Sequence, residues 1–507
     1  MAGEMRGWSV PKAGGCRRRR HRVIRRPGTL SGSAGHALGP VAAMSQPIPQ
    51  PRGIPLLGNI FDVNPANTWT SLNKLSVQYG EIFKIKALGK TIVFVSSVAL
   101  AEELCDEKRF RKYVGGPIVE IRAAVNAALF TCYESEDEVW GVAHRIMAPQ
   151  LQPAALALHF DEMRDTTREL LDTWKQAGQS SISPLGDLSR LNLELTTQTL
   201  TGCKMDALTG PENPMLRAME DSTSEAMMRP TRMSLVNWLL YGRKFKSAIK
   251  TMRTWAQGIV EQHKQKYGDE RPNNLLSAML HEKDPATGKG LTETQVIDEL
   301  VSMPIGSATT PCMLAYALFL LLKNPDKMAK ARDEIDGLLG DGELKLEHLE
   351  QLKYVEAVVR ETLRLSCAAA GFNIEPRPRD KAGDTSPVML AGGKYQVPHN
   401  QPMIIVMYGV NRDPAVFDEP EAFRPERFMG AEFERLPPGA KKWFGNGKRR
   451  CIGEHWAWQC SMVVLVLMLR EMDFEMKDAA YSMFQDGWFA IRPVGFDLKV
   501  QARAREA

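Results

Sequence analysis

A cysteine in a glycine-rich, basic segment is the residue of this sequence whose chemistry is easiest to identify. Residues 444–453 read FGNGKRRCIG, so Cys451 follows two arginines and lies among three glycines. Glycine lets a backbone approach closely and adopt positive φ, and nearby cations stabilise a thiolate. Residues 454–471 have helical periodicity, and the dipole of a helix that begins there also favours an anion. A thiolate in this setting suits an iron ligand; the alternative is a buried structural cysteine.

A long helix that two prolines interrupt is the second feature that indicates a ligand site. A capping box begins it at Thr292, and apolar residues continue to about residue 322, which predicts a helix of about thirty residues. Pro304 and Pro311 each remove one backbone hydrogen bond and clash with the carbonyl four residues earlier. We therefore expect the helix to be opened or kinked around residues 300–311, beside a ligand.

The elements that must position these residues are mostly helices. Most of 97–370 has helical periodicity, and the strand-like runs 82–87 and 91–95 are spaced as a hairpin. Short strands are expected near 395–397 and 403–408, and we see no internal repeat. The sequence predicts one large domain over 44–507, mainly α with small β-sheets.

Composition excludes several classes of protein. Of the 507 residues, 44% are hydrophobic and 25% charged, which is ordinary for a globular chain. The net charge of +5 comes from residues 1–43, which contain nine basic side chains and one acidic one, so the remainder is slightly acidic. Such a body has no strong electrostatic reason to bind nucleic acid. Residues 1–43 are expected to be a disordered extension: a mitochondrial transit segment, an extended start before Met44, or a basic arm that binds polyanions.

The cysteines and the apolar runs bear on the cellular setting. Eight cysteines are scattered without CxxC pairs, which is typical of a reduced, intracellular protein. The longest apolar runs, 313–322 and 462–469, are shorter than the roughly 20 residues of a spanning helix, so we expect no transmembrane anchor. We expect a cytoplasmic location, or a mitochondrial one if residues 1–43 are a transit segment.

The cysteine segment resembles the haem-binding loop of the cytochrome P-450 family, with its pattern Phe-x-x-Gly-x-Arg-x-Cys-x-Gly. The resemblance implies haem b (heme b) as cofactor, held between the long central helix and the cysteine loop. It makes Cys451 the axial thiolate, which increases electron density on the iron. Phe444 would lie against that thiolate, Arg449 would pair with a haem propionate, and Gly453 is also placed among the cofactor-binding residues.

Two further segments match the same family. Glu361 and Arg364 resemble its Glu-x-x-Arg helix motif, and residues 423–428, FRPERF, resemble its Phe-x-Pro-Glu-Arg-Phe segment. The resemblance implies a buried network of Glu361, Arg364 and Arg427 that holds the haem loop in place. Breaking one member would leave a buried charge unpaired. By itself a Glu and an Arg three residues apart is more often a solvated surface pair.

Trp140 and His144, one helical turn apart, resemble the family's Trp-x-x-x-Arg, whose side chains bind a propionate. Histidine at 144 is a departure from that pattern, and the alternative is a core tryptophan beside an exposed histidine. The resemblance also places Lys112 among the cofactor-binding residues.

Residues 305–310 read IGSATT, where the family shows Ala/Gly-Gly-x-Asp/Glu-Thr-Thr. Gly306 and Thr309 match, which makes Thr309 the candidate for hydrogen-bonding dioxygen and its water. The acid is absent, with Ala308 in its place, and Ile305 is bulkier than usual. Proton relay needs a titratable group or ordered water, so this departure puts the ordinary oxygen activation in doubt. The alternative is a threonine that bonds back to a helix carbonyl.

From about residue 47 to 500 the chain is most similar to the haem domains of fatty-acid hydroxylases fused to a reductase in bacteria and fungi. That subgroup holds the fatty-acid carboxylate with a cation and a tyrosine, and the aligned residues are Lys90 and Phe94, so the hydroxyl is missing. Lys90 fits a solvated turn lysine equally well. Phe130 resembles the aromatic residue over the haem that selects the oxidised carbon, although a plain core position fits it too.

The resemblance implies a monooxygenase that inserts one oxygen atom from O₂ into a C–H bond of a fatty acid or similar lipophile. Residues after 500 leave no room for flavin and nicotinamide domains, so we expect NADPH, FAD and FMN to act through a separate reductase. A truncated fusion would give the same sequence. The alternatives are oxidation or rearrangement driven by peroxide at the same haem, and a catalytically weak haem-binding protein.

Overall fold

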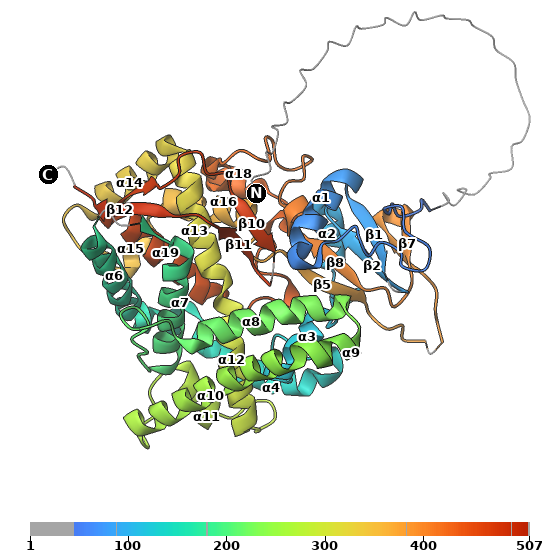
Figure 1. Cartoon of the computed structure of the whole chain (residues 1–507), viewed down its shortest axis with the longest axis horizontal. Coiled ribbons are helices and arrows are strands. Elements are labelled where there is room, and N and C mark those ends of the chain that lie inside the picture. Colours follow the sequence, from blue (N-terminus) through green and yellow to red (C-terminus); the bar gives the residue numbers. More distant parts are fainter. Residues whose placement is uncertain (1–44, 88, 179–180, 382, 488, 505–507) are drawn as a thin grey trace, which may run out of the picture. The chain divides into compact units, whose positions relative to one another are not determined.

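Helices make up most of the chain, as the periodicity of its apolar residues predicts. The computed structural model describes residues 45–87, 89–178, 181–381, 383–487 and 489–504 (Figure 1). The helices are α1 (Thr68–Tyr79), α2 (Val98–Leu104), α3 (Pro117–Val125), α4 (Asp137–Met147), α5 (Pro153–Leu156), α6 (Phe160–Ala177), α7 (Pro184–Thr201), α8 (Pro214–Met228), α9 (Ser234–Val236), α10 (Gly242–Tyr267), α11 (Leu275–His281), α12 (Glu293–Ser307), α13 (Thr309–Lys323), α14 (Pro325–Leu339), α15 (Leu346–Leu349), α16 (Lys353–Ser366), α17 (Met407–Val410), α18 (Gly430–Arg435) and α19 (Glu454–Glu471).

Four small sheets accompany the helices in the described part of the chain. The strands are β1 (Ile82–Ala87), β2 (Lys90–Val95), β3 (Phe110–Lys112), β4 (Ser181–Ile182), β5 (Gly371–Pro376), β6 (Val388–Leu390), β7 (Tyr395–Val397), β8 (Met403–Val406), β9 (Met472–Met476), β10 (Phe484–Gly487), β11 (Ile491–Val494) and β12 (Leu498–Ala502). The largest sheet has the order β1-β2-β8-β5-β3, and the others pair β10 with β11, β4 with β12 and β9, and β6 with β7. The predicted hairpin is confirmed, with Ile82 opposite Val95 and Ala87 opposite Lys90.

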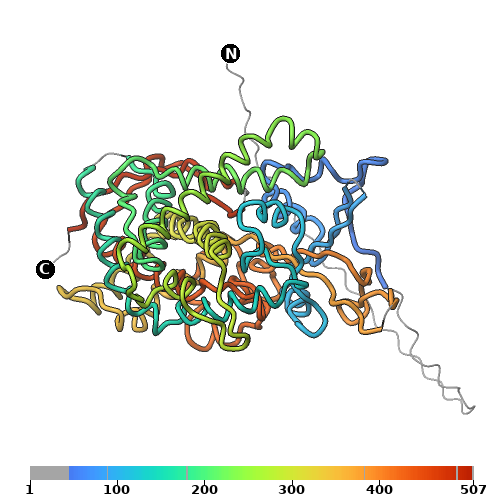
Figure 2. The backbone as a smooth tube through the Cα atoms, turned by 90° about the horizontal axis from the view of Figure 1, so that it is seen from below, coloured from blue at the N-terminus to red at the C-terminus, as the bar shows by residue number. Residues whose placement is uncertain are grey.

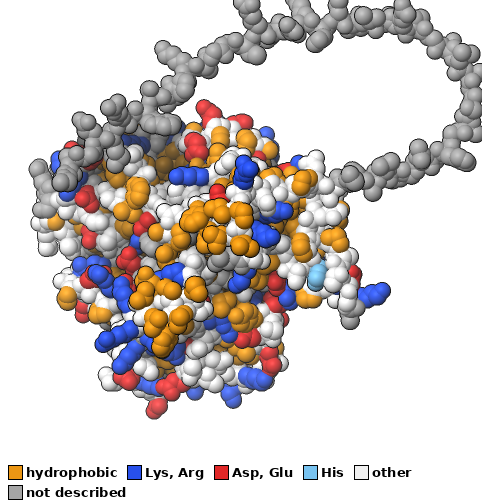
Figure 3. All heavy atoms as spheres, turned by 45° about the vertical axis from the view of Figure 1, so that its right-hand side comes forward, with side chains coloured by type: hydrophobic (Ala, Val, Ile, Leu, Met, Phe, Trp, Pro, Cys, Tyr) orange, Lys and Arg blue, Asp and Glu red, His pale blue; other side chains and the backbone are white. Residues whose placement is uncertain are grey.

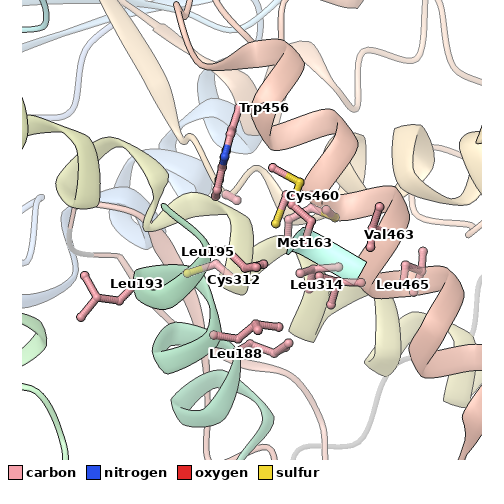
Figure 4. Close-up of a cluster of buried hydrophobic side chains, with 14 of the residues drawn as sticks. Met163, Leu188, Leu193, Leu195, Cys312, Leu314, Trp456, Cys460, Val463 and Leu465 are labelled. Carbon is pink, nitrogen blue, oxygen red and sulfur yellow. The ribbon is translucent and has the colours of Figure 1, made fainter. Parts of the chain in front are cut away.

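The main core lies where α19 crosses α6, α7 and α13. Residues 462–469 of α19 are at most 1% exposed, and a helix that is apolar on every side must be buried. Figure 4 shows the α19 residues Cys460 and Val463 beside Met163 of α6, with Leu188 of α7 and Leu314 of α13 in the same cluster. The apolar run that the sequence shows near the cysteine loop is therefore a core helix.

The long central helix is broken where the prolines predict. The Thr292 capping box begins α12, which ends at Ser307, and α13 starts at Thr309, so Ala308 is the break. Pro311 is tolerated because it lies in the first turn of α13, where backbone N–H groups have no helical partner. Other helices surround α12 and α13 on several sides (Figures 1 and 2).

Helix Glu293–Lys323, which spans both pieces, is the one helix of the described residues that is long and apolar enough to cross a membrane. Of its apolar window, 61% is buried inside the structure, as in the core helix of a folded domain. The expectation of no spanning segment was based on uninterrupted apolar runs, and these are shorter than the helix that the structure shows.

Residues Ser45–Ala507 form one compact unit. The expectations for residues 1–43 lie outside the described residues. The seven described cysteines are all free thiols, in agreement with the absence of paired spacing in the sequence. On the face shown in Figure 3, hydrophobic side chains gather in clusters between charged ones.

Candidate functional site

A cavity of about 1800 Å³ brings the cysteine loop and the broken helix together. Residues of α12 and α13, of segment 442–453 and of the five-stranded sheet all line it, and Cys451 and Thr309 are among them. Pockets for drug-sized ligands are about 300–1,000 Å³, so this cavity has room for a prosthetic group and a second molecule.

The cysteine loop turns tightly so that its thiol lines the cavity. Gly445 and Gly447 have φ of 80° and 57°, and a Cβ on Gly447 would lie 2.0 Å from the carboxyl carbon of Glu107. The Cys451 N–H donates to the Phe444 carbonyl at 2.9 Å. Gly453, in contrast, has an ordinary φ of −87° and is the N-cap of α19. Two of the three glycines are thus needed for positive φ.

Cys451 is exposed to the cavity, which lies inside the protein, so surrounding protein still desolvates its thiol. Burial raises its pKa, while the Gly453 N–H and the Arg450 charge lower it. A bound metal ion deprotonates a thiol outright. In the described part of the chain no group of three or more His, Cys, Asp or Glu is placed to hold a metal ion. A metal at Cys451 would therefore need its remaining ligands from a prosthetic group.

The broken helix presents Ile305, Gly306 and Thr309 to the same cavity. Gly306 is exposed there and has no Cβ to occupy the space, whereas Ile305 is only 2% exposed. The Thr309 hydroxyl lies 3.4 Å from the Gly306 carbonyl, which is a long contact for an O–H donor. Its hydroxyl therefore keeps capacity to bind a group in the cavity.

Ala308 does not line this cavity, which corrects the expectation that it belongs to the substrate site. It lines a separate space of about 20 Å³ with Asn192, Pro304 and Pro311. Residues 304, 308 and 311 are spaced as one face of a helix, and that face is turned toward α7. The residue where the family has an acid is therefore directed away from the main cavity.

Two cations meet at another wall of the cavity. The Lys112 ammonium donates to the Phe130 carbonyl at 2.5 Å, and burial, together with the charge of Arg449, lowers the Lys112 pKa to about 7. Arg449 donates to the Leu129 and Cys132 carbonyls at 3.2 and 3.1 Å. Its Nε is buried without a hydrogen-bond partner.

Trp140 and His144 of α4 lie against the same arginine. Their rings stack with centroids 4.6 Å apart, and the Arg449 guanidinium lies 4.8 Å from the Trp140 ring centroid. Burial lowers the pKa of His144, and the charges of Arg145 and Arg449 lower it further. Both residues line the cavity.

This wall has the charge of an anion site. Lys112 has no carboxylate within ion-pair distance among the described residues, and the carboxylate of Glu134 is 3.7 Å from Arg449. The unpartnered Arg449 Nε and the desolvated Lys112 would both be satisfied by carboxylates entering the cavity. The residues present therefore fit haem b: Lys112 and Arg449 would hold its propionates, and Cys451 would hold its iron.

Glu361, Arg364 and Arg427 form a buried ion network beneath the cysteine loop. Arg364 holds both oxygens of Glu361 at 2.7 Å, and Arg427 donates to Glu361 at 3.2 Å. The three side chains are 0%, 0% and 4% exposed. Phe428, next to Arg427, packs edge-on against Trp443 with ring centroids 5.4 Å apart. Since Trp443 precedes Phe444, the network supports the start of the loop.

Three of the residues expected to contact substrate, Lys90, Phe94 and Phe130, line the cavity. Lys90 and Phe94, four apart in β2, both line it; Lys90 is exposed, and Phe94 is stacked on Phe83 with centroids 5.0 Å apart. Phe130 also lines the cavity, beneath Lys112 and edge-on to Phe489 at 5.6 Å.

Polar residues of the cavity wall were missed from the sequence, and three of them lie on α12. Glu299, Ser302 and Ser307 line the cavity from α12, and Ser307 accepts a hydrogen bond from Asn192 at 2.9 Å. For Glu299 the sequence offered a signal, an acid inside an apolar helix pattern. Burying an unpaired carboxylate is costly, so such a residue indicates a site. Arg232, also on the lining, gave no such signal.

Comparison with known proteins agrees with this geometry. The family model for cytochrome P450 matches residues 48–500. The bifunctional cytochrome P450/NADPH–P450 reductase ascE of Acremonium egyptiacum is 33% identical over 91% of this chain and 44% of its own length. The self-sufficient cytochrome P450 monooxygenase CYP505E3 of Phanerodontia chrysosporium is 34% identical over 89% of this chain and 42% of its own length.

The chain thus spans less than half the length of these curated relatives, which are fused P450–reductase enzymes. The expected similarity to fused haem–reductase enzymes is confirmed, as is the mainly helical fold. With a cysteine-lined cavity between a broken central helix and a glycine-rich loop, this chain belongs to the cytochrome P450 family of monooxygenases.

Proposed function

We propose that this protein inserts one oxygen atom from O₂ into a C–H bond of a fatty acid or a similar long lipophile, using electrons from NADPH delivered by a reductase. The observation that carries the proposal is the shared cavity, in which Cys451 and the Gly306–Thr309 break both contact one continuous, mostly apolar space. When bound, haem supplies the redox chemistry of oxygen activation.

The chain's own residues would bind and orient the reactants. Cys451 would supply the axial thiolate, and Lys112, Arg449 and the Trp140–His144 pair would hold the propionate side. Thr309 would hold dioxygen and its water by hydrogen bonding at the helix break. Ile305 and Phe130 would narrow the space beside the oxidised carbon.

A lipophilic substrate is supported by the apolar rim of the cavity. Phe61 and Met233 both line the cavity and are 77% and 72% exposed, so apolar surface continues from solvent into its interior. Exposed apolar residues beside a cavity are typical of binding sites for apolar ligands. Lys90 and Arg232 are the cations at this side that would attract a carboxylate, although Arg232 is already paired with Glu225 at 2.6 Å.

A second candidate is oxidation driven by peroxide at the same site. It is favoured by the composition of the helix break, where Ala308 is directed toward α7 and provides no carboxyl for proton delivery to the cavity. Peroxide brings its own electrons and protons and removes that requirement.

The test is the absorption spectrum of the reduced holoprotein under carbon monoxide, followed by titration with fatty acids. We expect a red-shifted Soret band typical of thiolate ligation, lost in Cys451→Ala, and a spin-state shift on adding lipid. Turnover is then compared with NADPH and a reductase, and with hydrogen peroxide alone. Absence of the thiolate band in folded, haem-loaded protein would refute the proposal.

A further inference from the structure

Glu299 is a carboxyl group in the wall of the cavity that the reaction described above does not use. It lies on α12, is 2% exposed and lines the cavity beside Ser302 and Met303. No lysine, arginine or histidine of the described residues lies within ion-pair distance of it. Its neighbour Asp298 is different, because Arg253 pairs with that carboxylate at 2.5 Å.

Two donors reach Glu299, and they leave part of its capacity unused. The Leu129 N–H donates to one oxygen at 2.8 Å, and the Ser302 hydroxyl, which also bonds the Glu299 backbone carbonyl at 2.9 Å, lies 3.2 Å from the other. A carboxyl group has about four acceptor positions on its two oxygens. The Leu129 bond alone would be served equally by the uncharged glutamine, at a lower cost of burial.

The position of Glu299 suits a group of the substrate remote from the oxidised carbon. Gly306 follows Glu299 by seven positions, which corresponds to about 10 Å along α12. Burial raises the pKa of Glu299 to about 7, so near neutral pH much more of this group is uncharged than of an ordinary glutamate, and a neutral hydrogen-bonding partner suits it. A hydroxyl group can donate to the carboxyl group in either form, and it can also accept from the protonated form.

We propose that Glu299, together with Ser302, binds a hydroxyl group of an otherwise apolar substrate, about 10 Å from the carbon that is oxidised. This inference rests on the proposed function and specifies its substrate class. Glu299 is then a specificity-determining residue at the far end of the substrate from Thr309. Polar groups that converge in an apolar cavity fix orientation in this way.

The test compares two probes that differ by one donor, 1-dodecanol and its methyl ether. Their dissociation constants for the full-length holoprotein are measured by calorimetry. We expect the alcohol to bind about tenfold more tightly, the effect of one well-made hydrogen bond. Equal affinity for the two probes in the unmodified protein overturns the inference without any variant. Binding of neither probe refutes the proposed lipophilic substrate instead.

Variants assign the preference to the residue. Glu299→Gln keeps an acceptor oxygen and the bond from the Leu129 N–H, so it should keep a preference for the alcohol. Glu299→Leu should bind both probes equally, with affinity for the ether unchanged or higher. Met303→Leu, on the same wall, is the matched control and should keep the full preference. A tenfold preference that persists in Glu299→Leu also overturns the inference.

Discussion

The buried network of Glu361 with Arg364 and Arg427 allows a quantitative prediction of stability. Glu361→Gln removes the one carboxylate that faces both guanidinium groups, while the side chains keep their size. Both arginines then remain at 0% and 4% exposure with backbone carbonyls as their partners, such as that of Asn411 at 2.9 Å. Breaking one member of a buried ion pair costs about 3–5 kcal/mol.

The expected shift in melting temperature follows from the size of the folded unit. Unfolding entropy is about 2.1 cal/mol/K per residue, so about 460 residues give about 1 kcal/mol/K. The loss of 3–5 kcal/mol should therefore lower the melting temperature by about 3–5 °C. Because Phe428 and Trp443 connect the network to the cysteine loop, we also expect faster loss of haem at a temperature well below melting.

Calorimetric melting and haem transfer to a competing apoprotein measure the two effects. The matched control is Glu169→Gln, which breaks the ion pair with Lys204 at 2.7 Å, where both side chains are 44% exposed. That change should cost less than about 1 kcal/mol. If Glu361→Gln melts no lower than Glu169→Gln, the reasoning from burial is wrong.

Three further predictions follow from the cavity. Burial raises the pKa of Glu299 from 4.5 to about 7, so the free energy of unfolding should fall by about 3 kcal/mol as pH rises from 4.5 to 7. Urea titrations at several pH values should show that Glu299→Gln loses this pH dependence. An unchanged pH dependence in that variant contradicts the prediction. Lys112→Met should speed haem loss about tenfold in a transfer assay, because it removes a hydrogen-bond donor from the cationic wall of the cavity. Equal rates of haem loss would contradict this. Ala308→Glu should overfill the 20 Å³ space beside α7 and lower stability by about 1–3 kcal/mol. Coupling of NADPH use to product should not improve, and better coupling than in Ala308→Ser would show that the acid reaches the cavity.

Local patterns in the sequence determined the elements of this protein. The capping box at Thr292 and the two prolines predicted both the start of the central helix and its break, because these effects act within one or two turns. The hairpin of β1 and β2 and the cysteine just before α19 were predictable for the same reason. The family resemblance identified the members of the Glu361 network, because the family's sequence motifs include all three residues.

Tertiary structure alone decided which side chains share the cavity. The rotation of α12 about its axis directs Ala308 toward α7 and Glu299 into the cavity, and neither direction follows from residue type. The desolvation of Lys112 beside Arg449 also depends on elements far apart in the chain. Burial and charge at a site are sums over neighbours from several segments, so a sequence can name the reacting residues while the fold determines their environment.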